Sequence, residues 1–157
     1  MTKSAIVKLM ITSRSFKDKD VIPVKYGYNQ DNISPQLSWS VGPSGTKSYA
    51  LICQDPDAPR TEPWVHWVVS YIPGNESTLA EGASEHNNLL VQGLNDYKQE
   101  GWGGPNPPSG THRYFFTIYA LDTILPNKPM SKKELLAAMN NHILAQGEII
   151  GTYAADN

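Results

Sequence analysis

Two aspartates and two histidines occupy positions from which side chains can reach a small pocket. Asp55 and Asp57 lie in a proline-stiffened turn, Asp55-Pro56-Asp57-Ala58-Pro59, directly after an apolar run. His66 lies inside the next apolar run, and His112 opens a third one. Polar groups at the ends of buried strands build small-molecule sites, and carboxylates with imidazoles can hold a charged ligand or transfer protons.

Side-chain alternation predicts how the two histidines are presented. Residues two apart in a strand share a face of the sheet. His66 is therefore expected to face away from Trp67, and His112 is expected to share its face with Tyr114 and Phe116. Both histidines would then lie at the polar end of an otherwise apolar face, which is where the mouth of a pocket would be.

A loop rich in glycine and proline, residues 101–110, leads directly to His112. Gly103 and Gly104 leave their backbone N–H groups unobstructed, whereas Pro105 and the other prolines fix the backbone and remove donors. The result could be a stiff loop that presents N–H groups to an anion. The alternative is a rigid surface loop that binds nothing.

Each of these residues also has a structural interpretation. A buried histidine can be satisfied by a neighbouring polar group, and an aspartate before a proline often caps its own turn. If Asp55 and Asp57 instead face a pocket, they could orient His66 and His112, or one carboxylate could raise the pKa of the other. Because two histidines and an Asp-x-Asp pair occur together, we favour a shared ligand site over a separate structural role for each of the four residues.

Other kinds of site are weakly supported. No His-x-His or His-x-x-x-His pair occurs and one cysteine cannot build a zinc cluster, so we expect neither a metal nor another cofactor. Ser70 and Ser109 lack the Gly-x-Ser-x-Gly context of a nucleophile, and Cys53 lies among apolar neighbours, as an inert thiol does. A hydrolase with general acid and base catalysis by Asp and His is the enzyme alternative, and we favour a non-enzymatic binding role over it.

Length and composition narrow the class of protein. The 157 residues predict one domain over 1–157, and 12 glycines with 12 prolines indicate many turns. A net charge of −2 with scattered lysines and arginines argues against nucleic-acid binding. The lone Cys53, the lack of a signal-peptide core around 5–11 and the lack of any run of transmembrane length predict a cytoplasmic protein.

The hydrophobic pattern predicts a chain made mostly of strands. Runs that fit strands are 5–12, 21–26, 36–41, 48–54, 64–72, 114–121 and 148–154, with a weaker one at 89–93. One helix is predicted from Ser131 to Gln146, because Ser131 and Glu134 form a capping box and apolar residues then recur at helical spacing. Gly147 would end this helix. We therefore expect a β-sandwich or barrel with a peripheral helix, in the all-β or α+β class.

Four short motifs follow one another along the chain. They are Asp55-Pro56-Asp57-Ala58-Pro59, Trp64-x-His66-Trp67-Val68-Val69, Gly103-Gly104-Pro105-x-Pro107-Pro108 and His112-Arg113-Tyr114. Upstream of them lie Ile22-Pro23 and Asn32-Ile33-Ser34-Pro35-x-Leu37-Ser38-Trp39. Together these motifs resemble the phosphatidylethanolamine-binding protein family, which also includes the Raf kinase inhibitor proteins. The compact chain and its late helix resemble the bacterial and archaeal branch.

The resemblance implies an antiparallel β-sandwich with a C-terminal helix, short peripheral helices and a small pocket that binds anions such as phosphate groups. By position, the pocket would be lined by Asp55, Asp57, Pro59, His66, Gly103, Gly104, Pro105, His112 and Tyr114. The histidines would donate to the anion, the glycines would add backbone N–H groups, and the tyrosine would offer a hydroxyl or a wall. The aspartates would orient the histidines, or would pair with the ammonium group of a zwitterionic ligand such as phosphoethanolamine.

The expected function is therefore the binding of a small phosphate-bearing or other anionic ligand. Animal members of the resembled family regulate kinases, but fold alone does not transfer that role, so regulation of a kinase or protease stays open here. Some bacterial relatives are dimers, and a homodimer is compatible with the resemblance. Family members also have a cis peptide just before the tryptophan that corresponds to Trp64, and we therefore expect a cis bond between Glu62 and Pro63.

Overall fold

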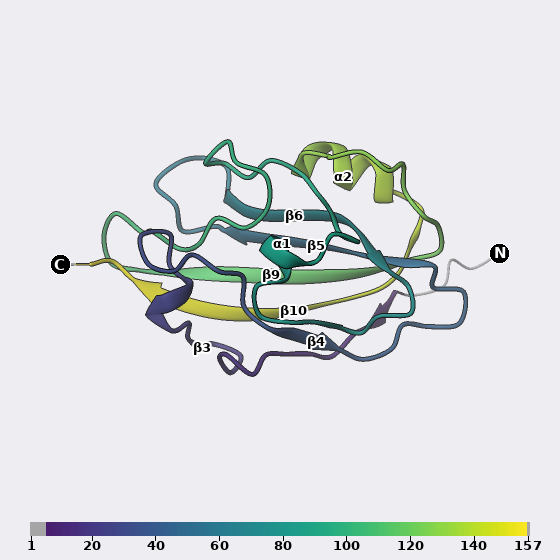
Figure 1. Cartoon of the computed structure of the whole chain (residues 1–157), viewed down its shortest axis with the longest axis horizontal. Helices are drawn as coiled ribbons and strands as arrows, with labels where there is room; N and C mark the ends of the chain where they lie inside the picture. The colour runs from purple at the N-terminus through teal and green to yellow at the C-terminus, as the bar shows by residue number, and fades with distance from the viewer. Residues whose placement is uncertain (1–5, 157) are drawn as a thin grey trace.

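Four long strands form the centre of the molecule. The computed structural model describes residues 6–156. The long strands are β5 (Ser48–Asp55), β6 (Trp64–Pro73), β9 (Thr111–Leu121) and β10 (Ile143–Ala154). They lie side by side in the order β10-β9-β5-β6, and each neighbouring pair is antiparallel (Figure 1). Because β5 has a partner strand on each side and is covered on both faces, its sequence is an almost continuous apolar run.

Short strands extend this sheet at its two edges. β8 (Val91–Gln92) pairs with β6, whereas β1 (Val7–Lys8) and β3 (Asp20–Val21) both pair with β10. The last two pairings are parallel. The sheet is therefore mixed at the β10 edge, where the resemblance implied antiparallel sheets.

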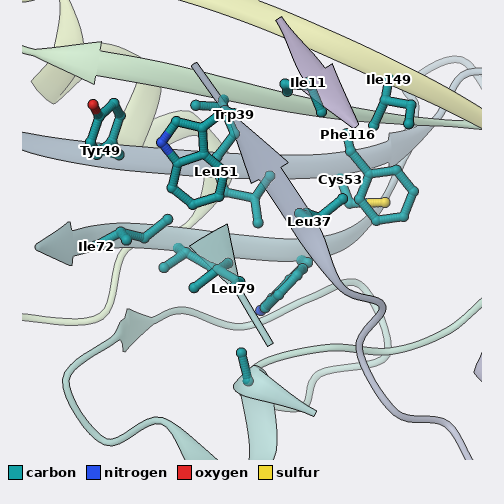
Figure 2. Packing of buried hydrophobic residues seen from close by; sticks show 14 of the residues in the cluster. Ile11, Leu37, Trp39, Tyr49, Leu51, Cys53, Ile72, Leu79, Phe116 and Ile149 are labelled. Atoms are coloured by element: carbon teal, nitrogen blue, oxygen red, sulfur yellow. The ribbon is translucent and has the colours of Figure 1, made fainter. Parts of the chain in front are cut away.

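A second, smaller sheet packs against one face of the large sheet. It contains β2 (Ile11–Thr12), β4 (Leu37–Trp39) and β7 (Thr78–Leu79), which pair antiparallel. Figure 2 shows the buried side chains between the two sheets: Ile11, Leu37, Trp39 and Leu79 from the small sheet, and Leu51, Cys53, Phe116 and Ile149 from the large one. The predicted β-sandwich is confirmed, because apolar faces of two sheets meet in one core.

The opposite face of the large sheet is covered by α2 (Lys132–Met139). Leu135 and Met139 from this helix pack with Ile52 of β5 and Val68 of β6 in a second core. In Figure 1 the helix and β4 lie on opposite sides of the long strands. A shorter helix, α1 (Ala83–His86), lies in the connection between β7 and β8. Within residues 6–156, no helix is long and apolar enough to cross a membrane.

The start of α2 agrees with the predicted capping box. The hydroxyl of Ser131 accepts the N–H of Glu134 at 3.1 Å, and the Glu134 carboxylate accepts the N–H of Ser131 at 3.0 Å. These two bonds satisfy N–H groups that the first turn of a helix leaves without partners.

The predicted end of this helix at Gln146 is wrong. The helix ends at Met139, because Asn140 leaves the helical backbone with ψ of 128°. Asn141 then adopts a left-handed backbone with φ of 69°, which asparagine tolerates better than most residues. His142 then accepts a backbone bond from Asp122 at 3.0 Å and lies 2.8 Å from the Asp122 carboxylate through Nδ1. These contacts turn the chain into β10, whose alternate residues are buried with the period of a strand.

Two of the predicted strands are divided in the structure. The run 5–12 supplies β1 to the large sheet and β2 to the small one, and Ala5 lies outside the described residues. The run 21–26 supplies the end of β3 and then a single 3-10 turn, η1 (Val24–Tyr26). The hydrophobic pattern predicts short strands at sheet edges least well, because few of their side chains are buried.

Gly147 gives a test of the packing at the β10 edge. It does not end a helix but lies buried in β10, and a Cβ there would overlap the carbonyl oxygen of Leu9. Gly147→Ala should therefore lower the free energy of unfolding by about 1–3 kcal/mol in a urea titration. The exposed neighbour provides a control, since Glu148→Ala should change it by less than about 0.5 kcal/mol. Equal stability of Gly147→Ala and wild type would contradict this packing.

Candidate functional site

Asp55 and His112 meet at one end of the large sheet. Asp55 ends β5, and His112 lies near the start of the neighbouring β9. Nδ1 of His112 is 2.6 Å from Oδ2 of Asp55, and the two residues are only 7% and 3% exposed. Oδ1 of the same carboxylate accepts the N–H of Asp57 at 2.7 Å. Because a carboxylate accepts, Nδ1 carries the hydrogen and Nε2 is left for another partner.

Asp57 is committed to a different contact. Its carboxylate accepts the backbone N–H of Arg113 at 3.0 Å and the side-chain Nε and Nη2 at 2.9 Å each. These hydrogen bonds favour the charged form and lower the pKa of Asp57 below its ordinary value. Asp57 does not line the cavity described below. It ties the turn to β9 next to His112, whereas the sequence interpretation had it facing the ligand.

A β-bulge displaces His66 from the expected alternation. The pairing of β6 with β5 slips by one residue between Val65 and Trp67, so His66 lies opposite no residue of β5. A bulge re-aims the side chains around it. The His66 ring packs on Tyr114 with 5.0 Å between centroids, and Trp67 lies in the same core as Tyr114. The expectation that His66 faces away from Trp67 is wrong, because one extra residue shifts the alternation.

His66 is neutral under ordinary conditions. Its Nδ1 lies 2.6 Å from the carbonyl oxygen of Gly103, so Nδ1 carries the hydrogen and Nε2 offers a lone pair. The residue is 2% exposed, and burial is the main cause that lowers the pKa of His66 to about 4. Near pH 7 this histidine brings no positive charge to the cavity.

The glycine-rich loop packs closely against the protein. The N–H of Gly103 donates to the carbonyl of His66 at 2.9 Å, and the N–H of Gly104 donates to Oδ1 of Asn32 at 2.7 Å. The carbonyl of Pro105 accepts a backbone N–H. Gly103, Gly104 and Pro105 therefore do not line the cavity. The N–H groups that the sequence assigned to an anion are engaged inside the protein.

A cavity of about 330 Å³ opens beside the Asp55–His112 pair. The residues of the sequence-based site that line it are Asp55, Pro59, His66, His112 and Tyr114. Its walls come from the turn after β5, the start of β6, the loop that precedes β9 and the start of β9 itself. The register of three adjacent strands thus brings together residues far apart in the sequence.

Further lining residues were not singled out by the sequence. Ala58, Arg60 and Trp64 come from the turn and the start of β6, whereas Tyr97, Asn106, Pro107 and Pro108 come from the segment before β9. Trp64 and the two prolines belong to the quoted motifs, so their position in the motifs could have indicated them. Arg60 and Tyr97 carry no such signal, because only the folded turns bring them to the cavity.

Arg60 is held rigidly at the side of the cavity. Its Nε donates to the carbonyl of Glu62 at 3.0 Å, and its Nη2 donates to the carbonyl of Pro63 at 2.9 Å and to Oδ2 of Asp96. Its guanidinium lies over the Trp64 ring, 4.6 Å from the centroid. Residues 6–156 contain no cis peptide, so the Glu62–Pro63 bond is trans and the expected cis bond is wrong. Arg60 closes this turn through its hydrogen bonds instead.

Two donors in cavity-lining residues lack an acceptor among the described residues. They are the hydroxyl of Tyr114 and the indole N–H of Trp64. Tyr114 is completely buried, and burial raises the pKa of its hydroxyl, which therefore keeps its hydrogen. An unsatisfied buried donor costs about 1–3 kcal/mol, so such groups usually meet a ligand or a water. Together with Nε2 of His112, they suit an oxygen-rich ligand.

The buried neutral His66 makes stability depend on pH. Between about pH 4 and pH 6.5 the unfolded chain binds a proton at His66 that the folded protein does not, so stability falls as pH falls. From pH 7 to pH 5 this loss should be about 2 kcal/mol in urea unfolding. His66→Asn keeps a donor for Gly103 and cannot titrate, so the loss should shrink by that amount. His86→Asn, at an exposed histidine, is the control and should behave like wild type. An identical pH dependence in all three proteins would rule out this role of His66.

Comparison with known proteins gives a consistent family. Residues 12–154 match the family model described as phosphatidylethanolamine-binding protein. A UPF0098 protein of Methanothermobacter thermautotrophicus is 46% identical over 147 residues, which cover 91% of this chain and 97% of that protein.

Solved structures agree with this match. The crystal structure of a phosphatidylethanolamine-binding protein homologue from Chlamydia trachomatis superposes with a TM-score of 0.87 at 42% identity, covering 95% of this chain and 99% of the other. YbcL of Escherichia coli superposes with a TM-score of 0.86 at 32% identity, covering 96% and 100%. The family match, the close relatives and the shared fold together show that this chain belongs to the phosphatidylethanolamine-binding protein family.

Proposed function

We propose that this protein binds a small ligand that carries a phosphate or another anionic group, with the anion beside His112. The observation that carries the proposal is the buried Asp55–His112 pair, which leaves Nε2 of His112 available, together with the Tyr114 hydroxyl, which has no partner among residues 6–156. Both groups belong to residues that line one cavity. An anion can accept from the Tyr114 hydroxyl and, when Nε2 of His112 also carries a hydrogen, from that nitrogen at the same time.

The charged groups around the cavity favour an anionic ligand over a neutral one. Nδ1 of His112 bonds to the Asp55 carboxylate, so an imidazolium form of this ring would lie between that carboxylate and the bound anion. Arg60 places a guanidinium in the lining, where it is paired with Asp96, and His66 stays neutral. When Nε2 of His112 carries a hydrogen as well, its contact with the anion is a charge-assisted hydrogen bond.

The relatives support the same class of ligand. The matched family is named for binding phosphatidylethanolamine, and the Chlamydia trachomatis structure is described as a homologue of such a protein. Phosphatidylethanolamine carries a phosphate, which is the chemistry proposed here. The completely buried Cys53, the only cysteine, fits a reducing compartment, and we propose a cytoplasmic location on that ground.

The hydroxyl of Tyr114 gives the sharpest test of this proposal. Inorganic phosphate should bind wild type at about millimolar to micromolar affinity in titration calorimetry. Tyr114→Phe removes a donor that has no partner among residues 6–156, so it should not destabilise the free protein, yet it should weaken phosphate binding by about tenfold or more. His112→Asn keeps a donor for Asp55, removes Nε2, and should weaken binding at least as much.

A result against the proposal is equally clear. If wild type does not bind phosphate at about millimolar concentration, or if both variants bind it as wild type does, the cavity is not the anion site. Thermal unfolding of the free proteins serves as the control, because a variant that has lost its fold would show a lowered midpoint.

The Asp55–His112 pair favours one alternative, a hydrolase in which His112 acts as a general base. A carboxylate that orients an imidazole is the arrangement used for that purpose in many hydrolases. The lining contains no serine or cysteine among the described residues, and Cys53 is fully buried, where burial raises the pKa of its thiol.

Turnover separates the two functions. We expect purified wild type to hydrolyse p-nitrophenyl phosphate and p-nitrophenyl acetate no faster than His112→Asn does, because binding alone needs no reaction. Turnover that is lost in His112→Asn would establish the hydrolase instead.

A further inference from the structure

The carboxylate that lines the cavity is already occupied by the protein. Asp55 is the only acidic residue in the lining, within residues 6–156. Oδ1 accepts the N–H of Asp57 at 2.7 Å, and Oδ2 accepts Nδ1 of His112 at 2.6 Å. An ammonium group on a ligand would have to compete with the imidazole for this buried carboxylate.

Two acidic residues bonded to or following residues of the turn are occupied as well. Asp57 accepts three hydrogen bonds from Arg113. Asp96 accepts from Arg60 and from the N–H of Val65, the latter at 2.7 Å. A ligand ammonium that entered the cavity would therefore lose water without gaining a free carboxylate, and an unpaired buried charge is costly.

The remaining walls of the cavity are flat and apolar. Pro59, Pro107 and Pro108 form part of the lining together with the rings of Trp64 and Tyr97. Proline rings have little conformational freedom to lose on binding. These ring faces offer contact to a planar, apolar group, and the hydrogen-bonding groups beside them are the indole N–H of Trp64 and the amide of Asn106.

The two aromatic walls are fixed before any ligand binds. Tyr97 stacks on Tyr28 with 3.9 Å between ring centroids, and its hydroxyl donates to the carbonyl of Gly104 at 2.8 Å. Trp64 packs edge-on against Tyr97 at 5.4 Å and carries Arg60 on its ring. A preformed slot binds a rigid group without a further loss of side-chain entropy. A volume of about 330 Å³ lies at the lower end for small-molecule pockets.

From these observations we infer that the cavity selects a phosphate monoester of an aromatic or other flat apolar group over a zwitterionic phosphate such as phosphoethanolamine. This inference rests on the proposed anion site and names the class of ligand that the site takes. The phosphate lies by His112 and Tyr114, and the flat group lies between the prolines and the aromatic rings. Apolar contact with the walls favours binding of the flat ester. Binding of phosphoethanolamine is disfavoured because its ammonium group would find no free carboxylate.

Three soluble probes test the inference in calorimetric titrations of the full chain: inorganic phosphate, phenyl phosphate and phosphoethanolamine. Phenyl phosphate should bind at least about tenfold more tightly than phosphoethanolamine, because burial of the ring adds apolar contact that the ethanolamine chain does not make. Inorganic phosphate reports on the anion site alone.

One variant should supply the missing carboxylate. Asn106 lines the cavity and is exposed, and Asn106→Asp keeps the oxygen that accepts from Asn29. The ratio of phosphoethanolamine affinity to phenyl phosphate affinity should rise by about fivefold in Asn106→Asp. Asn127→Asp adds the same charge at an exposed position outside the cavity, and it should leave the ratio unchanged.

Failure of this inference can be told apart from failure of the proposed function. If inorganic phosphate binds but phosphoethanolamine binds as tightly as phenyl phosphate or more tightly, the selectivity is wrong and the anion site stands. If Asn106→Asp leaves the ratio unchanged, the absence of a free carboxylate is not its cause and the inference is overturned. If none of the three probes binds, both the inference and the proposed function fail.

Discussion

The hydrogen bond between Asp55 and His112 is the interaction on which the cavity depends. It joins the turn after β5 to the start of β9, and it is possible only because the two strands pair with Gln54 opposite Phe115. The contact between Asp57 and Arg113 ties the same turn to β9 one residue further along. With two ties the turn has little freedom, so the imidazole is presented in one tautomer and one orientation.

The two histidines of the cavity show how environment divides similar residues into different roles. His66 is buried against aromatic rings and bonded to a carbonyl, so burial dominates and the neutral form is favoured. His112 bonds instead to a buried carboxylate, through Nδ1. His66 and Tyr114 therefore contribute neutral groups to the cavity, while the Arg60 guanidinium is paired with Asp96. Such a division lets a small cavity bind an anion without stacking several unpaired charges in a low dielectric.

Much of the fold follows from the hydrophobic pattern, and less of the site does. The runs 48–54, 64–72 and 114–121 coincide closely with long strands because both faces of the sheet are covered. The helix end was missed because its apolar spacing fits a continued helix, whereas the backbone leaves the helical conformation at Asn140 and Asn141. The aspartates and histidines could be found from their places at strand ends. The roles of Gly104 and Tyr97 could not, since a distant residue, Asn32, takes the N–H of Gly104 and only the folded chain brings Tyr97 to the cavity.

The ¹⁵N chemical shifts of the His112 imidazole, recorded with and without inorganic phosphate near pH 7, test the central claim most directly. Free protein should show hydrogen on Nδ1, as the contact with Asp55 requires. Addition of phosphate should change the Nε2 shift of His112, because the proposed anion contacts that nitrogen, while His66 keeps its neutral form. Hydrogen on Nε2 alone in the free protein, or His112 signals that do not respond to saturating phosphate, would contradict the claim that Asp55 holds His112 ready for an anion.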